Sequence, residues 1–234
     1  MIFTLFSLIL PTAYAHSWVE RAFVVRNGIM TGQPGYPRGN VQRAPTFRDQ
    51  DMTYRLPPAG RIPNKVSPED HVCMVSQRSL NYTQDSPMLL AQANDEVVLM
   101  YQENGHVTRI EEDVGHGRNG GTVMVIGTSN STFANTFQSV VSPANNYTKT
   151  LRVGSFDDGW CYQANETPKS RYRQMQPQRP HLESEGINLW CGQTVRLPST
   201  LRPGDIYTLY WIWFFDGVGF EERYTTCLDV RITG

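Results

Sequence analysis

A histidine stands directly after a stretch of sequence that has the form of a secretory leader. Residues 1–15 contain no charged side chain, and Ile2–Leu10 form an apolar run that is too short to span a bilayer. Ala13-Tyr14-Ala15 has the small-x-small pattern that signal peptidase accepts. We therefore expect cleavage after residue 15, which makes His16 the first residue of the mature chain. The alternative is that residues 1–15 form a buried N-terminal strand.

An N-terminal histidine has a chemistry that no internal histidine shares. The free α-amine and the imidazole Nδ1 of one residue can chelate a metal together. An α-amine ordinarily has a pKa of about 7.7–8.0, so metal binding displaces a proton that is already loosely held. A second imidazole would complete a three-nitrogen plane, which suits Cu(II) better than Zn(II), because zinc prefers a tetrahedron. The sequence therefore predicts copper as the cofactor of His16.

Four further histidines could supply the second imidazole. We favour His106, because it follows the apolar strand-like run Glu96–Tyr101 and an Asn-Gly dipeptide that favours a tight backbone reversal. His116 is the rival, but glycines flank it on both sides, and we expect a flexible, poorly organised ligand there. His71 and His181 are expected to be surface residues.

The charge balance argues against a polyanionic partner. The 234 residues contain 21 Lys and Arg and 22 Asp and Glu, which gives a formal charge of −1. We therefore expect no binding to nucleic acid. Beyond the leader, no apolar stretch is long enough for a membrane helix, so we expect a secreted, soluble, monomeric protein that does not associate with membranes.

The cysteines and the sequons both fit an oxidising secretory route. An even number of cysteines predicts two disulfides with three possible pairings, and the absence of any C-x-x-C spacing argues against a zinc site. The four cysteines are Cys73, Cys161, Cys191 and Cys227. Four Asn-x-Thr sequons are candidate glycan acceptors. Their asparagines are Asn81, Asn130, Asn146 and Asn165.

Short β-type runs separated by turn-rich loops predict an all-β sandwich that forms one domain over residues 16–234. The expected strands are Ser17–Arg26, Glu96–Tyr101, Gly121–Gly127, Thr150–Val153, Ile206–Phe215 and Thr225–Thr233. Thr31–Pro68 is expected to be a long irregular excursion, and Asn165–Gly186 a mobile surface loop. Trp211 and Trp213 share one face of an apolar strand, so we expect both in the core.

Several of these features together resemble the fungal lytic polysaccharide monooxygenases. The mature chain would open with His16, the segment 104–107 reads Asn-Gly-His-Val, and Tyr224 stands three residues before Cys227. Glu222, two residues before that tyrosine, occupies the position of a Gln or Glu that orients oxygen species in the family. The HSWVE opening and the later GQPGYPRG are more similar to a less characterised fungal group of such secreted, histidine-first proteins.

The resemblance implies an immunoglobulin/fibronectin-like β-sandwich that holds copper in a histidine brace formed by His16 and His106. Tyr224 would occupy the axial position and Glu222 would position the oxygen species. The implied activity is oxidation of glycosidic bonds in an insoluble polysaccharide, such as cellulose, chitin or another wall polymer, with electrons from an external donor. The alternatives without a catalytic role are that Tyr224 is a core or edge tyrosine and that Glu222 lies on a solvated face.

A second function stays open, because the well-studied family members carry a further histidine for which Leu209–Phe215 offers no equivalent. The alternative is a secreted copper-binding protein without catalysis, in copper acquisition or at the cell surface. The resemblance also implies that Cys73 pairs with Cys227, which leaves Cys161 for Cys191. For contacts with substrate, Trp18 and Tyr36 are the surface candidates.

Overall fold

The computed structural model describes residues 16–132, 135–177 and 184–234, without the side chains of 184 and 185. The expected leader (residues 1–15) and His181 lie outside these ranges. Within the described part of the chain, no helix is long and apolar enough to cross a membrane.

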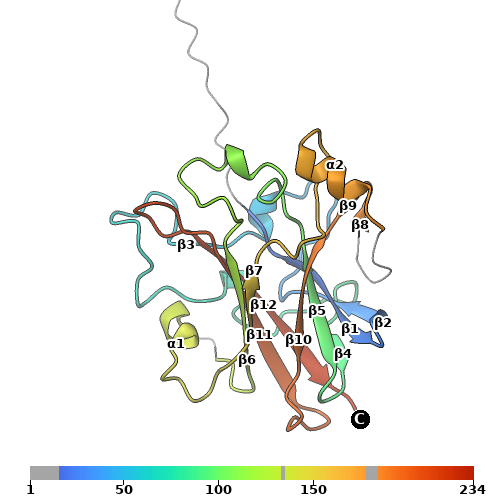
Figure 1. Cartoon of the computed structure of the whole chain (residues 1–234). Helices are drawn as coiled ribbons and strands as arrows, with labels where there is room; N and C mark the ends of the chain where they lie inside the picture. The colour runs from blue at the N-terminus through green and yellow to red at the C-terminus, as the bar shows by residue number, and fades with distance from the viewer. Residues whose placement is uncertain (1–15, 133–134, 178–183) are drawn as a thin grey trace, which may run out of the picture.

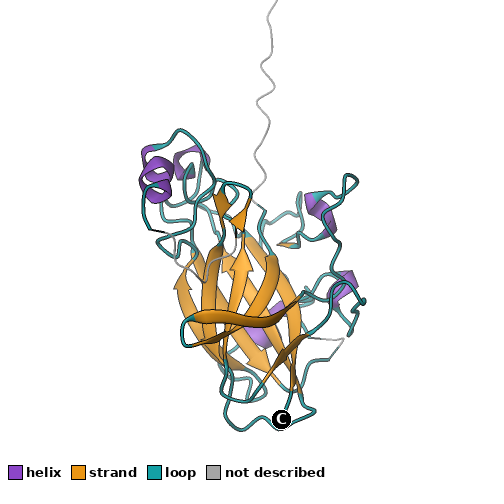
Figure 2. Ribbon diagram, turned by 90° about the vertical axis from the view of Figure 1, so that its right-hand side faces the viewer, coloured by secondary structure: helices purple, strands orange, loops and turns teal. Residues whose placement is uncertain are grey.

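Two β-sheets pack face to face, which confirms the predicted all-β sandwich (Figures 1 and 2). The first sheet has the strand order β10-β5-β1-β2, with β1 Val19–Arg26, β2 Ile29–Gly35, β5 Glu96–Tyr101 and β10 Cys191–Arg196. The second has the order β3-β12-β11-β6-β7, with β3 Arg55–Leu56, β6 Thr122–Thr128, β7 Lys149–Ser155, β11 Ile206–Phe214 and β12 Arg223–Ile232. All these neighbours pair antiparallel, whereas β4 (Leu89–Ala91) pairs with β12 in parallel.

The remaining elements are short and lie in the loops, as Figure 2 shows. They are the helices α1 (Phe137–Val141) and α2 (Pro168–Gln174), the 3₁₀ helices η1 (Asp49–Asp51), η2 (Val75–Gln77) and η3 (Ile110–Glu112), and the two-stranded sheet of β8 (Ser184–Glu185) and β9 (Asn188–Leu189). In Figure 1, α2 and η3 lie at the upper end of the sandwich and α1 lies at the lower left.

Each of the six expected strands corresponds to an observed one, whereas both segments expected to lack regular structure contain some. Thr31–Pro68 includes part of β2, η1 and β3. The prediction of a surface loop at Asn165–Gly186 was wrong for residues 168–174, which form α2. The helix begins with a Thr167 side chain that accepts a hydrogen bond from the Ser170 amide at 3.2 Å, followed by Pro168 in the first turn. Both are recognised helix-start signals. These signals were missed because the basic residues of this segment suggested a solvated loop.

The core lies between the sheets and contains the tryptophans of β11, as predicted. Trp211 and Trp213 are fully buried, and the indole N–H of Trp213 donates to the Gly120 carbonyl at 2.7 Å. The Trp213 ring stacks on Phe156 at a centroid distance of 4.1 Å. Large aromatic side chains that pack in this way contribute much of the apolar area that stabilises a sandwich.

Covalent and ionic links tie the irregular segments to both sheets, through Cys191 on β10 and through Cys227 and Asp229 on β12. The structure pairs Cys73 with Cys227 and Cys161 with Cys191, which confirms both implied disulfides. Within the excursion Thr31–Pro68, the buried Arg38 side chain forms a bidentate pair with the buried Asp229 on β12, at 2.7 and 2.6 Å. Breaking such a buried pair leaves an uncompensated charge, so Arg38 is an anchor of the excursion.

Candidate metal centre

The turn that precedes His106 has the tight reversal expected from its Asn-Gly sequence. Asn104 and Gly105 have φ angles of +47° and +92°, in the left-handed region that Asn and Gly tolerate best. The His106 amide donates to the Glu103 carbonyl at 2.8 Å and closes the turn. The turn follows β5 after only a few residues, so the end of a strand that is paired on both sides, with β10 and β1, determines where His106 lies.

A buried carboxylate fixes this turn from inside. The Glu103 side chain is 2% exposed and accepts hydrogen bonds from the Val107 amide at 2.8 Å and the Gln163 amide at 2.7 Å. The Thr108 hydroxyl donates to the same carboxylate at 2.5 Å. Because each partner is an N–H or O–H donor to a charged acceptor, these bonds are strong and directional. Glu103 therefore holds the His106 turn against the segment that leads into α2.

The register of the first sheet brings His16 to this turn. Val19 on β1 is paired with Tyr101 on β5 in an antiparallel ladder. Three residues back along one chain and three forward along the other place His16 opposite Asn104, since antiparallel partners move in opposite directions. The Asn104 side-chain amide donates to the His16 carbonyl at 2.7 Å, as this register requires. The predicted first residue and the predicted second ligand therefore lie beside the same turn.

The His106 ring is held as a metal-binding imidazole would be. It is 3% exposed, its Nδ1 lies 2.9 Å from an Asp113 carboxylate oxygen, and its Nε2 is buried with no hydrogen-bond partner among the described residues. An imidazole that gives one nitrogen to a carboxylate and offers the other to a metal is the usual arrangement around protein-bound transition metals. A buried polar atom without a partner is costly, and a metal ion would remove that cost.

The His16 ring is half-buried and already held on one side. Its Nε2 forms an ion pair with the Asp49 carboxylate at the start of η1. That contact engages Nε2 and not Nδ1, the ring atom that chelates together with the residue's own amine. Asp49 therefore orients the His16 ring in the same way as Asp113 orients the His106 ring. No sequence pattern identified either carboxylate.

Tyr224 and Glu222 form a buried hydrogen-bonded pair on and beside β12. The Tyr224 hydroxyl donates to a Glu222 carboxylate oxygen at 2.7 Å, and the residues are 1% and 6% exposed. Burial raises the pKa of Tyr224 well above its ordinary value, and the Glu222 carboxylate raises that pKa further. The phenol therefore stays protonated. The Trp213 ring lies between this pair and the His106 ring, with centroids 5.1 Å from Tyr224 and 5.2 Å from His106.

The alternative of a solvated face at 222 was wrong. Glu222 can be buried because the Arg55 guanidinium on the short strand β3 lies 3.2 Å from its carboxylate. The positive charge of Arg55 compensates for the water that the carboxylate loses. The strand pairing of Arg55 with Tyr224 places the cation there. Sequence reasoning missed Arg55, since a two-residue strand inside an irregular excursion has no periodic signal.

The prediction that His116 is poorly organised was also wrong. Its ring stacks on Phe215 at a centroid distance of 4.0 Å with an interplanar angle of 8°, and its side chain is 11% exposed. Neither ring nitrogen has a hydrogen-bond partner among the described residues, but Nε2 lies 3.5 Å from the Glu222 carboxylate. A backbone bridge between His116 and Gly217 holds the loop. Strand β11 contains no histidine, so the imidazole that lies beside Glu222 comes from the loop at His116.

The two candidates for substrate contact differ from expectation. Trp18 was expected on the surface but is only 2% exposed, because Arg43 from the excursion covers its ring at 5.2 Å and Phe47 packs beside it. Tyr36 is half-buried and lines a cavity of about 330 Å³ together with Arg21 and Trp190. The proposed contact with substrate therefore loses Trp18, while Tyr36 stays a prediction.

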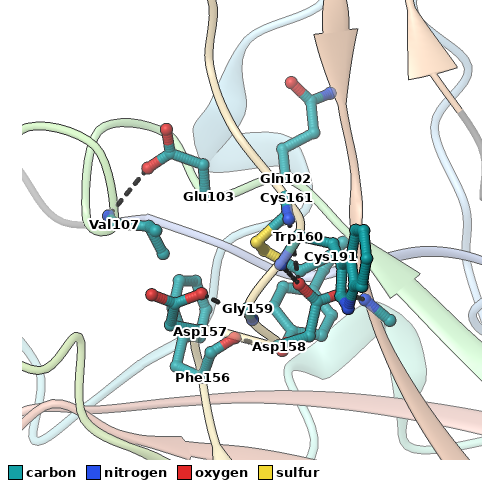
Figure 3. The surroundings of a disulfide bond; sticks show 12 residues. Gln102, Glu103, Val107, Phe156, Asp157, Asp158, Gly159, Trp160, Cys161 and Cys191 are labelled. Atoms are coloured by element: carbon teal, nitrogen blue, oxygen red, sulfur yellow. Dashed lines mark hydrogen bonds between the residues drawn. A yellow bond between two sulfur atoms is a disulfide. The ribbon is translucent and has the colours of Figure 1, made fainter. Parts of the chain in front are cut away.

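Other residues of the kinds that bind metal ions lie away from the His16 and His106 turn. His71 was expected on the surface but is half-buried, with a backbone bridge to Thr136. Asp158, Cys161 and Cys191 gather within 4.8 Å of one another (Figure 3). There both sulfurs belong to a disulfide, and the Asp158 carboxylate accepts three backbone N–H groups at 2.8–2.9 Å. This cluster is a structural junction and not a metal site.

A comparison with protein families now places the chain. A family described as a domain of unknown function, DUF7492, matches residues 13–234. The chain belongs to the DUF7492 family. The match covers the whole sandwich, so the turn at 103–106, the two histidines and the Glu222–Tyr224 pair all lie inside the DUF7492 domain. A search of curated proteins finds no match.

Proposed function

We propose that this DUF7492 protein is a secreted copper-dependent monooxygenase that oxidises glycosidic bonds of an insoluble polysaccharide. His16, once it begins the chain, and His106 would hold the copper. The observation that carries the proposal is the buried Nε2 of His106, which has no partner among the described residues and lies on a turn bonded to His16. The resemblance to the fungal polysaccharide monooxygenases supports the reaction class.

The residues present fit a copper ion. The donor set consists of two imidazoles and one amine, and such nitrogen donors suit Cu(II). Structural zinc sites, in contrast, are usually rich in cysteine. Carboxylates of Asp49 and Asp113 already orient the two rings. When bound, copper would supply the one-electron chemistry that lets dioxygen or hydrogen peroxide, with electrons from an external donor, attack an unactivated C–H bond.

The surrounding side chains would position and protonate rather than bind substrate. Tyr224 keeps its proton and donates it in a hydrogen bond to Glu222, so its neutral oxygen would be at most a weak ligand for the copper. The Glu222 carboxylate, balanced by Arg55, would orient oxygen species near the metal. His116 lies beside Glu222 and can hold a proton at Nε2 for transfer through that carboxylate.

We expect the variant Asp113→Ala to bind Cu(II) about 10–100-fold more weakly than the unaltered protein. The carboxylate fixes the orientation of the His106 ring, and that support is lost with it. Isothermal titration of the two proteins with Cu(II) measures the difference. Glu112→Ala, one residue away on η3, is the matched control and should leave the affinity unchanged. Equal affinities for Asp113→Ala and the control would show that the carboxylate does not organise a ligand.

We expect His116→Phe to keep copper affinity and lose at least about 10-fold in oxidation rate, since general acid–base assistance contributes about 10²–10⁴-fold. Phe preserves the stacking on Phe215 and removes only the ring nitrogens. The measurement is the initial rate of product formation at saturating copper, with ascorbate as reductant. A rate unchanged from the parent would remove His116 from the mechanism.

The activity itself is tested on a panel of cellulose, chitin and other wall polymers with ascorbate and peroxide. We expect oxidised oligosaccharides, detected by mass spectrometry, from at least one polymer. His106→Ala, which should lack the second ligand, is the control for copper leached into solution. Products at the same level with both proteins, or with neither across the panel, would contradict catalysis.

A second candidate function is copper binding without catalysis, for copper acquisition or at the cell surface. The burial of Trp18 favours it, because one of the two aromatic side chains expected to stack on a sugar cannot reach one. Tight copper binding together with no oxidised product from any polymer would support this candidate.

A further inference from the structure

The four sequons are not equivalent in the folded chain. The side chains of Asn81, Asn130 and Asn146 are exposed, whereas Asn165 is half-buried. A glycan replaces one of the two hydrogens on an asparagine amide nitrogen and adds a bulky, hydrated group. A sequon can therefore carry a glycan in the folded protein only if its amide nitrogen can give up one hydrogen and face solvent.

Both amide hydrogens of Asn165 are used inside the protein. Its Nδ2 donates to the Thr108 hydroxyl at 2.9 Å and to the Gln163 carbonyl at 3.0 Å. Thr108 is 2% exposed, so that bond points into the structure. The Asn165 side-chain oxygen accepts from the Thr167 amide at 3.0 Å. A glycan on Nδ2 would break one bond and would have to occupy space beside a buried residue.

The sequon at Asn165 coincides with the start of a helix. Thr167 is the N-cap of α2, and Asn165 forms the turn before it, so an Asn-x-Thr pattern arises here from helix-start chemistry. The same hydrogen bond to Thr108 ties α2 to the segment that follows His106. Asn165 is thus a link between α2 and the candidate metal centre.

The other three asparagines gather at the opposite end of the sandwich. Strand β6 begins next to Gly120, which approaches the His106 carbonyl, and ends at Thr128, about 20 Å further along. The Asn130 amide and the Tyr147 carbonyl both bond to the Thr128 hydroxyl, at 2.9 and 2.6 Å. These contacts place Asn130 and Asn146 at the far end of β6.

Asn81 lies at the same level. The neighbouring Tyr82 hydroxyl donates to Asp229 on β12 at 2.8 Å, Asp229 is paired with Thr208 on β11, and Thr208 is paired with Thr128. Figure 1 shows the loops beyond the end of β6, with α1, at the end opposite to α2 and η3.

We propose that the secreted protein carries N-linked glycans at Asn81, Asn130 and Asn146 and none at Asn165. The glycans then surround the end of the sandwich remote from His16 and leave the His16 end bare. This deepens the proposed function, on whose secretory route it rests, because a bare metal-bearing end can approach a solid polymer surface that three glycans at the same end would keep at a distance.

The test uses the full chain, with its leader, secreted by a yeast host. Glycans are released enzymatically in heavy-oxygen water, which marks each formerly occupied asparagine as a labelled aspartate in the peptide map. We expect labels at Asn81, Asn130 and Asn146 and an unlabelled Asn165. A glycan on Asn165 of the folded, secreted protein, or an empty position among the other three, would overturn the proposal. N-terminal sequencing of the same sample tests His16 separately, so a failure of the copper proposal is read independently.

Matched Asn→Gln variants separate the two roles of the sequons. Asn81→Gln, Asn130→Gln and Asn146→Gln should each lose the mass of one glycan and, after glycan removal, keep the parent Tm. Asn165→Gln should lose no glycan mass but lower Tm by roughly 3–8 °C, since the three internal hydrogen bonds of the Asn165 side chain are displaced. A loss of glycan mass in Asn165→Gln, or a Tm equal to that of the parent, would contradict the structural role assigned to Asn165.

Discussion

A chain that begins one residue before His16 is expected to bind Cu(II) more than about 100-fold more weakly than a chain that begins at His16. The additional peptide bond converts the α-amine into an amide, which is not a donor near neutral pH, so the chelate loses one of three nitrogens. Losing a direct ligand should cost at least as much as the 10–100-fold lost with a residue that only orients one. Competitive titration against a chelator of known affinity measures the ratio.

The control for this experiment is stability without metal. His16 lies before β1, which begins at Val19, and is only half-buried, so an additional residue should leave the metal-free Tm unchanged. Two proteins with equal Tm and equal copper affinity would eliminate the terminal amine as a ligand, and with it both proposed functions.

Replacing Cys73 and Cys227 with serine is expected to lower the free energy of unfolding by about 5 kcal/mol. This disulfide closes a loop of 154 residues, and cross-linking distant positions restricts the unfolded chain most. The matched variant, with serine at 161 and 191, opens a loop of 30 residues and should cost about 3.6 kcal/mol on the same basis. Denaturant unfolding of the three proteins gives both differences.

The pair of variants also tests how the candidate site is held. Cys227 lies on β12 three residues after Tyr224. Its partner Cys73 belongs to a segment that packs against Cys227 in a second buried cluster. If the variant at 161 and 191 proved the less stable of the two, loop closure would not be the source of the stabilisation, and native packing around each bridge would have to explain the order.

Local chemistry explains which parts of the site could be predicted from sequence. The reversal at Asn104-Gly105 is encoded by two adjacent residues that tolerate positive φ, so a tight turn at His106 just after an apolar strand was predictable. The strands β5 and β11 were equally clear, since they are uninterrupted apolar runs. The pairing of β1 with β5, which brings His16 to the turn, is compatible with that pattern but not determined by it.

The contacts that were missed are all long-range. Arg43 covers Trp18 from within an irregular segment, so proximity to the N-terminus did not imply exposure. His116 is ordered by a ring just beyond β11, about a hundred positions away, and its flanking glycines indicated flexibility instead. Asp49 and Asp113 orient the two histidine rings from loops, where single carboxylates follow no periodic pattern. Only the spatial arrangement of the loops distinguishes them from other acidic residues.

Diffraction from a crystal of the chain beginning at His16, loaded with Cu(II) and measured at the copper absorption edge, would locate the metal without reference to activity. We predict one strong anomalous peak bonded to the amine and Nδ1 of His16 and to Nε2 of His106, with Asp113 still on Nδ1. A copper peak at any other place, or a His106 ring turned away from His16, would contradict the histidine brace.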